Sequence, residues 1–375
     1  MKLQVLREKL NYGINIVSRT IAKTTSLPIL EGIMVKAEKN FLHLTATDLE
    51  VAIDWWALAK VEKEGEIVIP ARNFSNLIKS ITSSKLSLQS NKESLLIQDK
   101  ISKNSLQGLK AEEFPLIPGI EEKECLELDS ADFCHGLEQV VNCVALSETR
   151  PEISGIYLNF SKDKVLIAAT DSFRLSQKTI SLKSKNTIKK SIGLILPHKT
   201  AQHLIAVLAD ENQSIKICFS SGQILFETPM TETEHPRVRV ISRLVEGSYP
   251  NYQEIIPKKY NFVLKVDRKD FLSRVKTASV FSDRVNEVKL NISSKEKKLI
   301  IEAQSARIGK SESSLPIELK GDDLKISFDC RFLTDALTNI NSKEVVLSFV
   351  DQEKACLIKS AEDESYFYIL MPIKS

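Results

Sequence analysis

The sequence contains little glycine, and the few glycines are far apart. Of the 375 residues only 12 are glycine, and the two closest, Gly108 and Gly119, are eleven positions apart. A dinucleotide-binding loop, a phosphate-binding loop and the nucleophile turn of α/β-hydrolases all need glycines two to five positions apart, because the backbone must turn tightly or approach a ligand closely. These three kinds of site are therefore excluded.

The cysteines and histidines lack the spacings of metal and redox sites. The six cysteines lie at positions 125, 134, 143, 218, 330 and 356, so no two of them have the spacing of a redox motif or a zinc knuckle. None of the five histidines forms an i, i+4 pair around a glutamate, as helical zinc proteases require. We interpret the cysteines as buried thiols and expect no metal and no cofactor.

Long apolar runs and an excess of one charge are also missing. Hydrophobic residues make up 42% of the chain and charged residues 27%, with a net charge of +3. No apolar run approaches the roughly 18 to 20 residues of a membrane span, and the first residues lack the apolar block of a secretory signal. We therefore expect a cytoplasmic globular protein without a membrane partner.

The sequence repeats itself three times. Val5 closes a short alternating stretch that predicts a strand, and Leu10, Ile14 and Val17 follow at helical spacing. The same pattern recurs 123 positions later, at Leu128, Phe133, Leu137 and Val140, and 261 positions later, at Val266, Phe271, Val275 and Ala278. Three copies of one structural unit are predicted.

Each copy also contains a second strand and helix. Residues 65–70, 192–197 and 324–328 predict strands, and each is followed by apolar residues at helical spacing. Pro and Gly gather at 114–119 and 247–257 and mark the boundaries. The prediction is an α+β fold with domains at 1–124, 125–257 and 258–375, each built from two strand-helix-strand units.

A Thr-Asp pair ends the same strand in the first two copies. Ala46-Thr47-Asp48 and Ala169-Thr170-Asp171 are 123 positions apart, whereas Gln304 follows the matching strand of the third copy. Duplicated acids are also the signature of aspartic proteases. The residues after Asp48 and Asp171 are not the glycines that such a protease needs, so we expect the two acids to fix turns by accepting hydrogen bonds from backbone amides.

Several short motifs together resemble one family, the bacterial beta sliding clamps. They are Leu27-Pro28-Ile29-Leu30, the Ala-Thr-Asp repeats with Phe173-Arg174-Leu175, Tyr249-Pro250-Asn251-Tyr252 with Pro257, and Ile369-Leu370-Met371-Pro372-Ile373. The resemblance covers the whole chain in order. It implies a non-enzymatic processivity factor for the replicative DNA polymerase III.

The resemblance also implies an architecture and partners. Each domain would place two helices inside and antiparallel sheets outside, and two chains would join head to tail in a ring around double-stranded DNA. The partners would be the polymerase alpha subunit, the clamp loader and other proteins with a clamp-binding motif. A ring held by topology needs only weak, sequence-independent phosphate attraction, which agrees with the nearly neutral charge. An interaction scaffold unrelated to DNA would share the repeats but not the ring.

The DNA-binding residues implied by the resemblance lie on helices and adjacent loops. They are Arg19, Lys23, Arg72, Lys79, Arg150, Tyr157, His198, Lys199, Arg274 and Lys276. Where the family has an arginine this chain has Thr24, which Lys23 or Arg19 would replace, and one of two family tyrosines is Ile156. The alternative is that each cation is an ordinary solvated surface charge.

The second implied site is a peptide-binding groove. Its lining would be Leu158, Thr170, Arg174, Leu175, Pro250, Ile255, Ala355, Ile369, Met371, Pro372 and Ile373. Aliphatic and Met side chains suit an adaptable apolar floor, and Arg174 and Thr170 could orient a peptide. The alternative is that the run from Ile369 to Ile373 is only an edge or core strand. Pro372 argues against a central strand there.

This chain departs from the family at two places near the implied groove, and the resemblance also implies a subunit interface. Ser172-Phe173 stand where the family often has Gly-His, and Glu254 stands where a groove arginine is common. We therefore expect an altered rim charge. The interface would use Val280 and Phe281 against Leu106, although these residues could equally be buried within their own domains.

Overall fold

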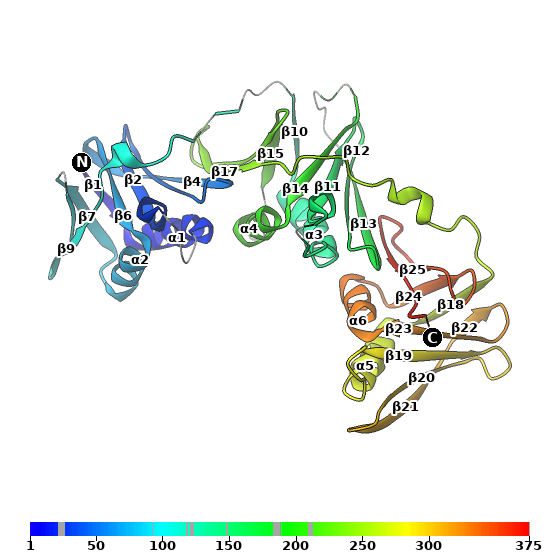
Figure 1. Cartoon of the computed structure of the whole chain (residues 1–375). Coiled ribbons are helices and arrows are strands. Elements are labelled where there is room, and N and C mark those ends of the chain that lie inside the picture. The colour runs from blue at the N-terminus through cyan, green and yellow to red at the C-terminus, as the bar shows by residue number, and fades with distance from the viewer. Residues whose placement is uncertain are drawn as a thin grey trace. The chain divides into compact units, whose positions relative to one another are not determined.

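The strand followed by a helix is present in all three predicted copies. The computed structural model describes residues 1–21, 27–91, 93–117, 119–120, 124–147, 149–182, 188, 190–208 and 213–374. β1 (Lys2–Leu6) leads into α1 (Arg7–Val17), β10 (Glu124–Asp129) into α3 (Ser130–Val141), and β18 (Phe262–Asp267) into α5 (Arg268–Ser279) (Figure 1). The hydrophobic spacing therefore located these elements correctly.

The second strand and helix of each copy are confirmed as well. β6 (Gly65–Pro70) precedes α2 (Ala71–Ser80), β14 (Ile192–Pro197) precedes α4 (His198–Leu208), and β23 (Leu324–Asp329) precedes α6 (Cys330–Asn339). In the third copy an aspartate starts both helices. Asp267 accepts a hydrogen bond from the Asp270 amide at 2.9 Å, and Asp329 accepts one from the Arg331 amide at 2.8 Å.

The contacts within the chain group it into two compact units. The first holds Met1–Cys134, Lys183–Lys189 and Lys199–Leu244, and the second holds His135–Leu182, Lys190–His198 and Val245–Ser375. The middle third of the chain is therefore shared between the units, although the repeats divide the sequence into three. Sheets that continue from one copy into the next cause this division.

The first unit contains two antiparallel sheets among its described residues. One has the strand order β5-β1-β7-β8-β9 and the other β10-β15-β16-β17-β4-β3-β2-β6. The strands not yet given are β2 (Gly32–Glu38), β3 (Phe41–Thr47), β4 (Val51–Leu58), β5 (Lys60–Lys63), β7 (Lys85–Ser90), β8 (Ser94–Gln98), β9 (Lys103–Gln107), β15 (Ser214–Phe219), β16 (Gln223–Pro229) and β17 (Pro236–Arg243). Pairing of β17 with β4 joins the first copy to the second.

The second unit is built in the same way. Its described strands form the orders β14-β11-β12-β13-β26-β25-β24-β18-β22 and β21-β20-β19-β23. The strands not yet given are β11 (Gly155–Phe160), β12 (Lys164–Thr170), β13 (Arg174–Ser181), β19 (Glu287–Ser293), β20 (Lys298–Ser305), β21 (Gly309–Pro316), β22 (Glu318–Lys320), β24 (Glu344–Phe349), β25 (Cys356–Ser360) and β26 (Tyr366–Leu370). Here β13 pairs with β26 and joins the second copy to the third.

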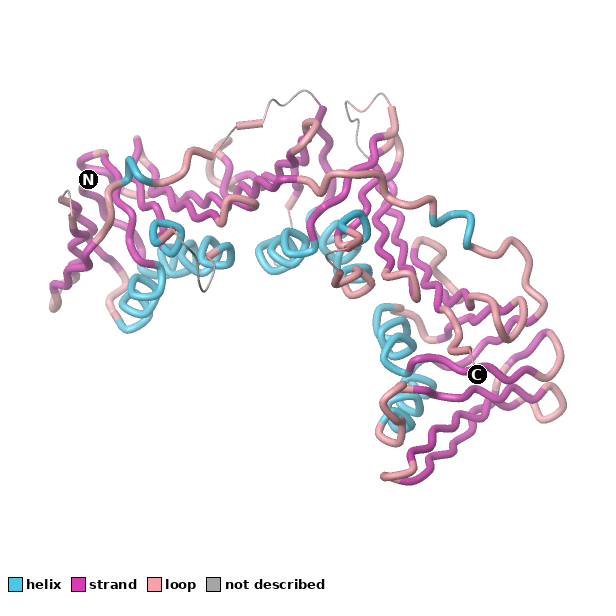
Figure 2. The backbone as a smooth tube through the Cα atoms, in the orientation of Figure 1, coloured by secondary structure: helices cyan, strands magenta, loops and turns pink. Residues whose placement is uncertain are grey.

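Within each unit the helices cover one face of the sheets (Figure 2). On α1, Leu10, Ile14 and Val17 are fully buried, and the helix packs against β4 and β3. Gly13 lies so close to the indole of Trp55 that a β-carbon there would be 2.2 Å from its Cε3. The predicted apolar face of the helix is therefore its core face. In the parts of the chain described, no helix is long and apolar enough to cross a membrane.

The Thr-Asp pairs form the same turn in both copies. Thr47 ends β3 and Thr170 ends β12. Asp48 Oδ1 accepts hydrogen bonds from the amides of Glu50 at 3.1 Å and Val51 at 2.8 Å, and Asp171 Oδ1 accepts equivalent bonds from Phe173 and Arg174, both at 2.9 Å. The predicted structural role of the two acids is confirmed.

The interpretation of all six cysteines as thiols was wrong for one pair. Cys125 and Cys218 form a disulfide between β10 and β15, whose register places the two residues directly opposite each other. They are 93 positions apart in sequence, so only the strand pairing reveals their proximity. The other four cysteines are buried thiols, and burial raises the pKa of Cys143 to about 12.

Candidate peptide-binding and nucleic-acid interfaces

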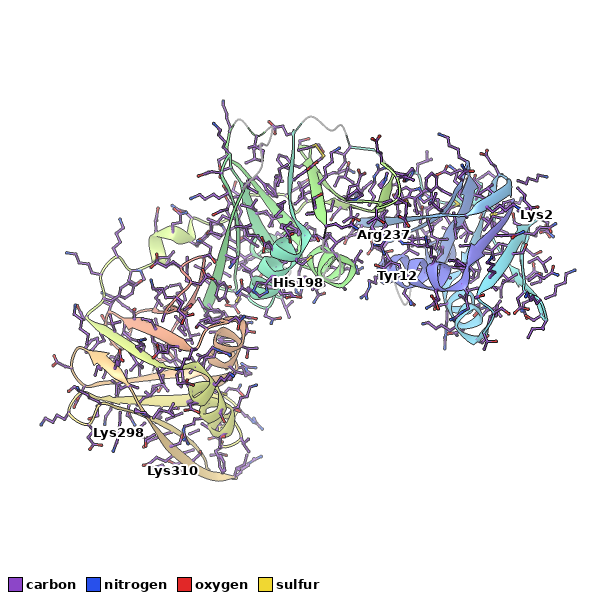
Figure 3. All side chains as sticks on the ribbon, turned by 180° about the vertical axis from the view of Figure 1, so that it is seen from behind. Lys2, Tyr12, His198, Arg237, Lys298 and Lys310 are labelled. Atoms are coloured by element: carbon purple, nitrogen blue, oxygen red, sulfur yellow. A yellow bond between two sulfur atoms is a disulfide. The ribbon has the colours of Figure 1, made fainter. Side chains whose placement is uncertain are left out.

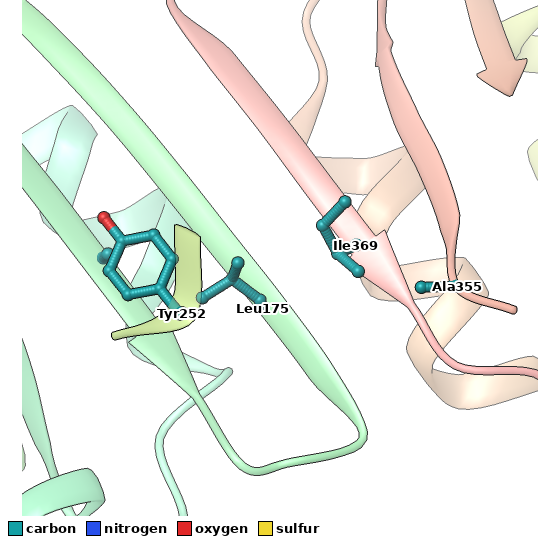
Figure 4. Packing of buried hydrophobic residues seen from close by; sticks show 5 residues of the cluster. Leu175, Tyr252, Ala355 and Ile369 are labelled. Atoms are coloured by element: carbon teal, nitrogen blue, oxygen red, sulfur yellow. The ribbon is translucent and has the colours of Figure 1, made fainter. Parts of the chain in front are cut away.

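An apolar cluster on the second unit brings together four of the eleven predicted groove residues, Leu175, Ala355, Ile369 and Met371. Its buried members are Ala168, Leu175, Tyr252, Ala355 and Ile369 (Figure 4). They come from β12, β13, the linker, the residue before β25, and β26. Tyr157, Leu166, Tyr249, Ile256, Leu357, Phe367 and Met371 are partly buried and pack against them. Leu175 and Ile369 are direct partners in the β13–β26 register, which explains their contact.

The strand register places Tyr157 and Leu158 on opposite faces of the sheet. Tyr157 pairs with Ala168, a member of the apolar cluster, whereas Leu158 pairs with Ile167. Ile167 faces α3, since a β-carbon on Gly136 of that helix would be 2.8 Å from its Cδ1. Paired residues lie on the same face of a sheet and neighbours along a strand on opposite faces. Leu158 therefore lies on the helix side, and Tyr157, predicted to contact DNA, lies in the apolar cluster.

Sequence reasoning missed the aromatic part of this cluster. Tyr157 and Tyr249 stack with ring centroids 5.0 Å apart, and the Tyr252 hydroxyl donates a hydrogen bond to Gln177 at 2.8 Å. Burial raises the pKa of the Tyr249 and Tyr252 hydroxyls. The Tyr-Pro-Asn-Tyr motif is the available signal, but only its Pro250 is among the predicted groove residues.

Arg174 is held by neighbours within the second unit. Its guanidinium donates to Asp171 at 2.8 Å and Asp335 at 3.0 Å, also donates to the Asn142 carbonyl, and lies 4.2 Å from the Phe332 ring centre. Burial alone lowers the pKa of Arg174, but its neighbours raise it overall. The side chain is thus fixed on the helix side of the sheet, opposite the face on which the neighbouring Leu175 joins the apolar cluster.

The other predicted groove residues differ in how far they are exposed. Pro250, Met371, Pro372 and Ile373 are half-buried, and Ile255 is 53% exposed. β26 lies between β13 and β25 in its sheet but ends at Leu370, so Met371, Pro372 and Ile373 follow the strand. The Thr170 hydroxyl donates to the Arg174 carbonyl at 2.7 Å. Phe173 is 64% exposed at the rim.

Several predicted DNA-binding cations lie on exposed surfaces of the helices. Arg72 and Lys79 are on α2, Arg274 and Lys276 are on α5, and Arg19 is in the short turn after α1. Among the described residues none of these five side chains forms an ion pair, so their charges remain available to an anion.

Other predicted DNA-binding residues have partners within their own unit. Lys199 pairs with Asp48, and Arg150 donates to Glu152 at 3.3 Å and to Ser172 at 3.0 Å. His198 begins α4 (Figure 3), and burial lowers its pKa. Lys23, with Thr24, falls outside the described residues.

The predicted interface residues lie at accessible positions. Leu106 is half-buried on β9, at one edge of the first sheet of the first unit. Val280 and Phe281 directly follow α5, as predicted, and Val280 is 62% exposed. β21 also forms a sheet edge, in the second unit.

Comparison with protein families covers nearly the whole chain. The N-terminal, central and C-terminal domain models of the DNA polymerase III beta subunit match residues 1–118, 127–251 and 253–374. They occur in the same order as the three copies found in the sequence.

Individual relatives agree with this assignment. The chain is 27% identical to beta sliding clamps of Staphylococcus epidermidis and Staphylococcus aureus, with 100% of both sequences covered in each comparison. It resembles the crystal structure of the DNA polymerase sliding clamp from Bacillus subtilis with a TM-score of 0.92 at 27% identity, covering 100% of this chain and 99% of the other.

A more distant structure supports the fold. The Pseudomonas aeruginosa sliding clamp bound to griselimycin has a TM-score of 0.93 at 22% identity and is covered completely, as is this chain. The three domain matches, full-length relatives and shared fold lead to one conclusion: the chain belongs to the family of DNA polymerase III beta subunits, the beta sliding clamps, which are processivity factors and not enzymes.

Proposed function

We propose that two copies of this chain close head to tail into a ring that encircles duplex DNA, with clamp domains at 1–124, 125–257 and 258–375. The observation that carries this proposal is that β9 and β21 each leave one side of a sheet unpaired among the described strands. Unpaired backbone amides and carbonyls at a sheet edge can pair with another chain. Different edges meeting head to tail generate a closed ring when the rotation closes.

The helices would face the DNA in this ring. The free cations of α2 and α5, together with Arg19, would attract phosphates without reading bases. Lys199 and Arg150 would contribute less, since Asp48 and Glu152 already balance their charges. A nearly neutral protein with a net charge of +3 would remain on DNA by topology and move along it.

The apolar cluster of the second unit would bind partner peptides. Its proposed lining keeps the other predicted residues and gains Tyr157, which shares the cluster, whereas Leu158 and the Arg174 side chain lie on the opposite face. Thr170 would hold the adjoining turn in place, and Arg174 would support the sheet from the helix side. The proposed ligands are the linear motifs of the polymerase alpha subunit, the clamp loader and repair proteins, in the cytoplasm.

Retention on DNA tests the ring. The protein is loaded onto nicked circular DNA with its clamp loader and ATP, washed at high salt, and the circle is then cut once. We expect the protein to stay on the circle and leave the linear molecule, because salt screens phosphate contacts but does not break a topological link. Equal loss from both DNAs would contradict the ring and favour a scaffold unrelated to DNA.

A further inference from the structure

The turn beside the apolar cluster has a copy in the first unit. The Thr47 hydroxyl donates to the Val51 carbonyl at 2.9 Å, as the Thr170 hydroxyl donates to the Arg174 carbonyl at 2.7 Å. The third turn residue has a positive φ in both copies, 77° at Leu49 and 78° at Ser172. The backbone turn that borders the proposed groove therefore occurs in both units.

The strands that follow these turns are also paired equivalently. Ala52 on β4 is opposite Ile241 on β17, as Leu175 on β13 is opposite Ile369 on β26. Next to these pairs, the amide of Arg243, the last residue of β17, donates to the Glu50 carbonyl, and the amide of Met371, just after β26, donates to the Phe173 carbonyl, both at 2.9 Å. The two surfaces share one framework but carry different side chains.

A cavity of about 250 Å³ lies on this second framework, entirely within the first unit. Ala52 and Ile241 line it together with the linker residues Pro115, Leu116 and Ile117. Ile117 also packs against the buried cluster that contains Ile241. Small-molecule sites usually span about 300 to 1,000 Å³, so this cavity is small for a whole small-molecule ligand. Its size suits one or two aliphatic side chains of a peptide.

The lining of the cavity includes apolar side chains that are exposed to solvent. Leu49 is 46% exposed although it occupies a left-handed backbone conformation with φ of 77°, which favours Gly, Asn or Asp. Leu116 is 97% exposed on the linker. An exposed leucine in a strained conformation points to a ligand contact.

Two opposite charges complete the rim. Glu50 and Arg243 both line the cavity and are exposed. In the part of the chain that the structure describes, neither side chain forms an ion pair. A ligand with one acidic and one basic residue would complement both, and an arginine fork binds a carboxylate particularly well.

We propose that this cavity is a second peptide-binding site, for an extended segment with two aliphatic side chains flanked by one acidic and one basic residue. The choice of a peptide rests on the proposed function of the apolar cluster on the second unit, whose framework the cavity repeats. The cavity itself, its apolar rim and its charges are independent of that function.

Methyl NMR of the full-length protein tests both sites in one sample. Ile241 and Ile369 occupy equivalent positions, so their labelled δ1 methyl groups report separately on the cavity and on the proposed groove. The probe is an acetylated and amidated hexapeptide with two Leu, one Lys and one Asp. A control peptide has both Leu replaced by Ser.

We expect the Ile241 signal to shift and saturate with the probe but not with the control peptide. Leu49→Asp should weaken this response at least tenfold and leave the Ile369 response unchanged, and Arg243→Glu should weaken it about threefold or more. Asp suits a positive φ better than Leu does, so the variant should fold. Ile101→Asp, which changes an exposed isoleucine outside the cavity lining, is the matched control.

Each outcome decides between the two sites. A shift of Ile369 alone would overturn the second site and leave the proposed groove intact, and a shift of Ile241 alone would do the reverse. An Ile241 response that Leu49→Asp does not change, or no Ile241 response at 2 mM probe, would also overturn the inference. Concentration-dependent sedimentation would show whether a second copy of the chain occupies the cavity instead, which would contradict the peptide proposal.

Discussion

His203 on α4 is a buried ionisable side chain whose Nε2 has no hydrogen-bond partner among the described residues. Burial lowers its pKa below the ordinary value of 6.5; Lys199 and Arg19 lower it further and Asp48 opposes them. The folded protein therefore binds a proton here less readily than the unfolded chain does. Since stability rises with pH wherever the unfolded state holds more protons, this site stabilises the fold above about pH 6.5 and loses that contribution as the pH falls.

The first prediction concerns this pH dependence. We expect the urea midpoint of the wild-type protein to fall between pH 7.5 and pH 5, and His203→Gln to reduce that fall because the site no longer titrates. Urea unfolding at both pH values measures the effect. His135→Gln, at an exposed position on α3, is the control. An identical pH dependence in wild type and His203→Gln would contradict the role of burial.

The second prediction concerns the charge of a single residue, Glu254. Its carboxylate accepts a hydrogen bond from Asn251 at 2.7 Å and lies in the linker, two residues after Tyr252 of the apolar cluster. Glu254→Arg reverses a rim charge, so acidic peptides should bind about three- to tenfold more tightly and basic peptides more weakly. Fluorescence anisotropy with both kinds of peptide measures this. Unchanged affinities across the panel would show that the charge of Glu254 does not influence peptide binding.

At the scale of elements, hydrophobic spacing was sufficient to locate the helices and the strands that precede them. Each of these helices has a buried apolar stripe that the 3.6-residue period reveals. Spacing was insufficient for the sheet faces at Tyr157 and Leu158, because a shift of one residue exchanges the two faces of a strand. The groove assignment of Leu158 and the DNA assignment of Tyr157 came from the family resemblance, and only the strand pairing separates the faces on which they lie.

The packing of α1 against β4 gives a third prediction. Replacing a glycine inside a helix by alanine normally stabilises the helix by about 1 kcal/mol. In Gly13→Ala the new methyl group would lie 2.2 Å from the buried indole of Trp55, and overpacking costs about 1 to 3 kcal/mol. We expect a net loss of stability, measured by urea unfolding. Gly222→Ala, whose new methyl group would have no atom of the described residues within 4 Å, should be nearly neutral. A stabilised Gly13→Ala protein would show that the indole moves without cost.

At the scale of the whole molecule, the fourth prediction concerns the ring. Phe281 is half-buried directly after α5, beside the exposed Val280. A charge at an interface core is costly, so Phe281→Asp should shift the sedimentation coefficient from that of a dimer to that of a monomer. It should also abolish retention on circular DNA. Leu146→Asp, at another exposed apolar position, should remain dimeric. A dimeric Phe281→Asp protein would remove Phe281 from the interface.

The sequence by itself determined the three copies, their strand-helix order and the Thr-Asp turns. These features depend on local periodicity and on short-range hydrogen bonds, which neighbouring residues specify. Motifs spread over the whole chain also indicated the family, which the domain matches show.

Only the tertiary structure decided how the copies join. The pairing of β17 with β4 and of β13 with β26 extends sheets across the copies and divides the chain into two units. The same pairings created the apolar cluster on the second unit and the cavity on the first, and the pairing of β10 with β15 brought Cys125 to Cys218. Strand partners are chosen by contacts between residues far apart in sequence, and no local pattern encodes that choice.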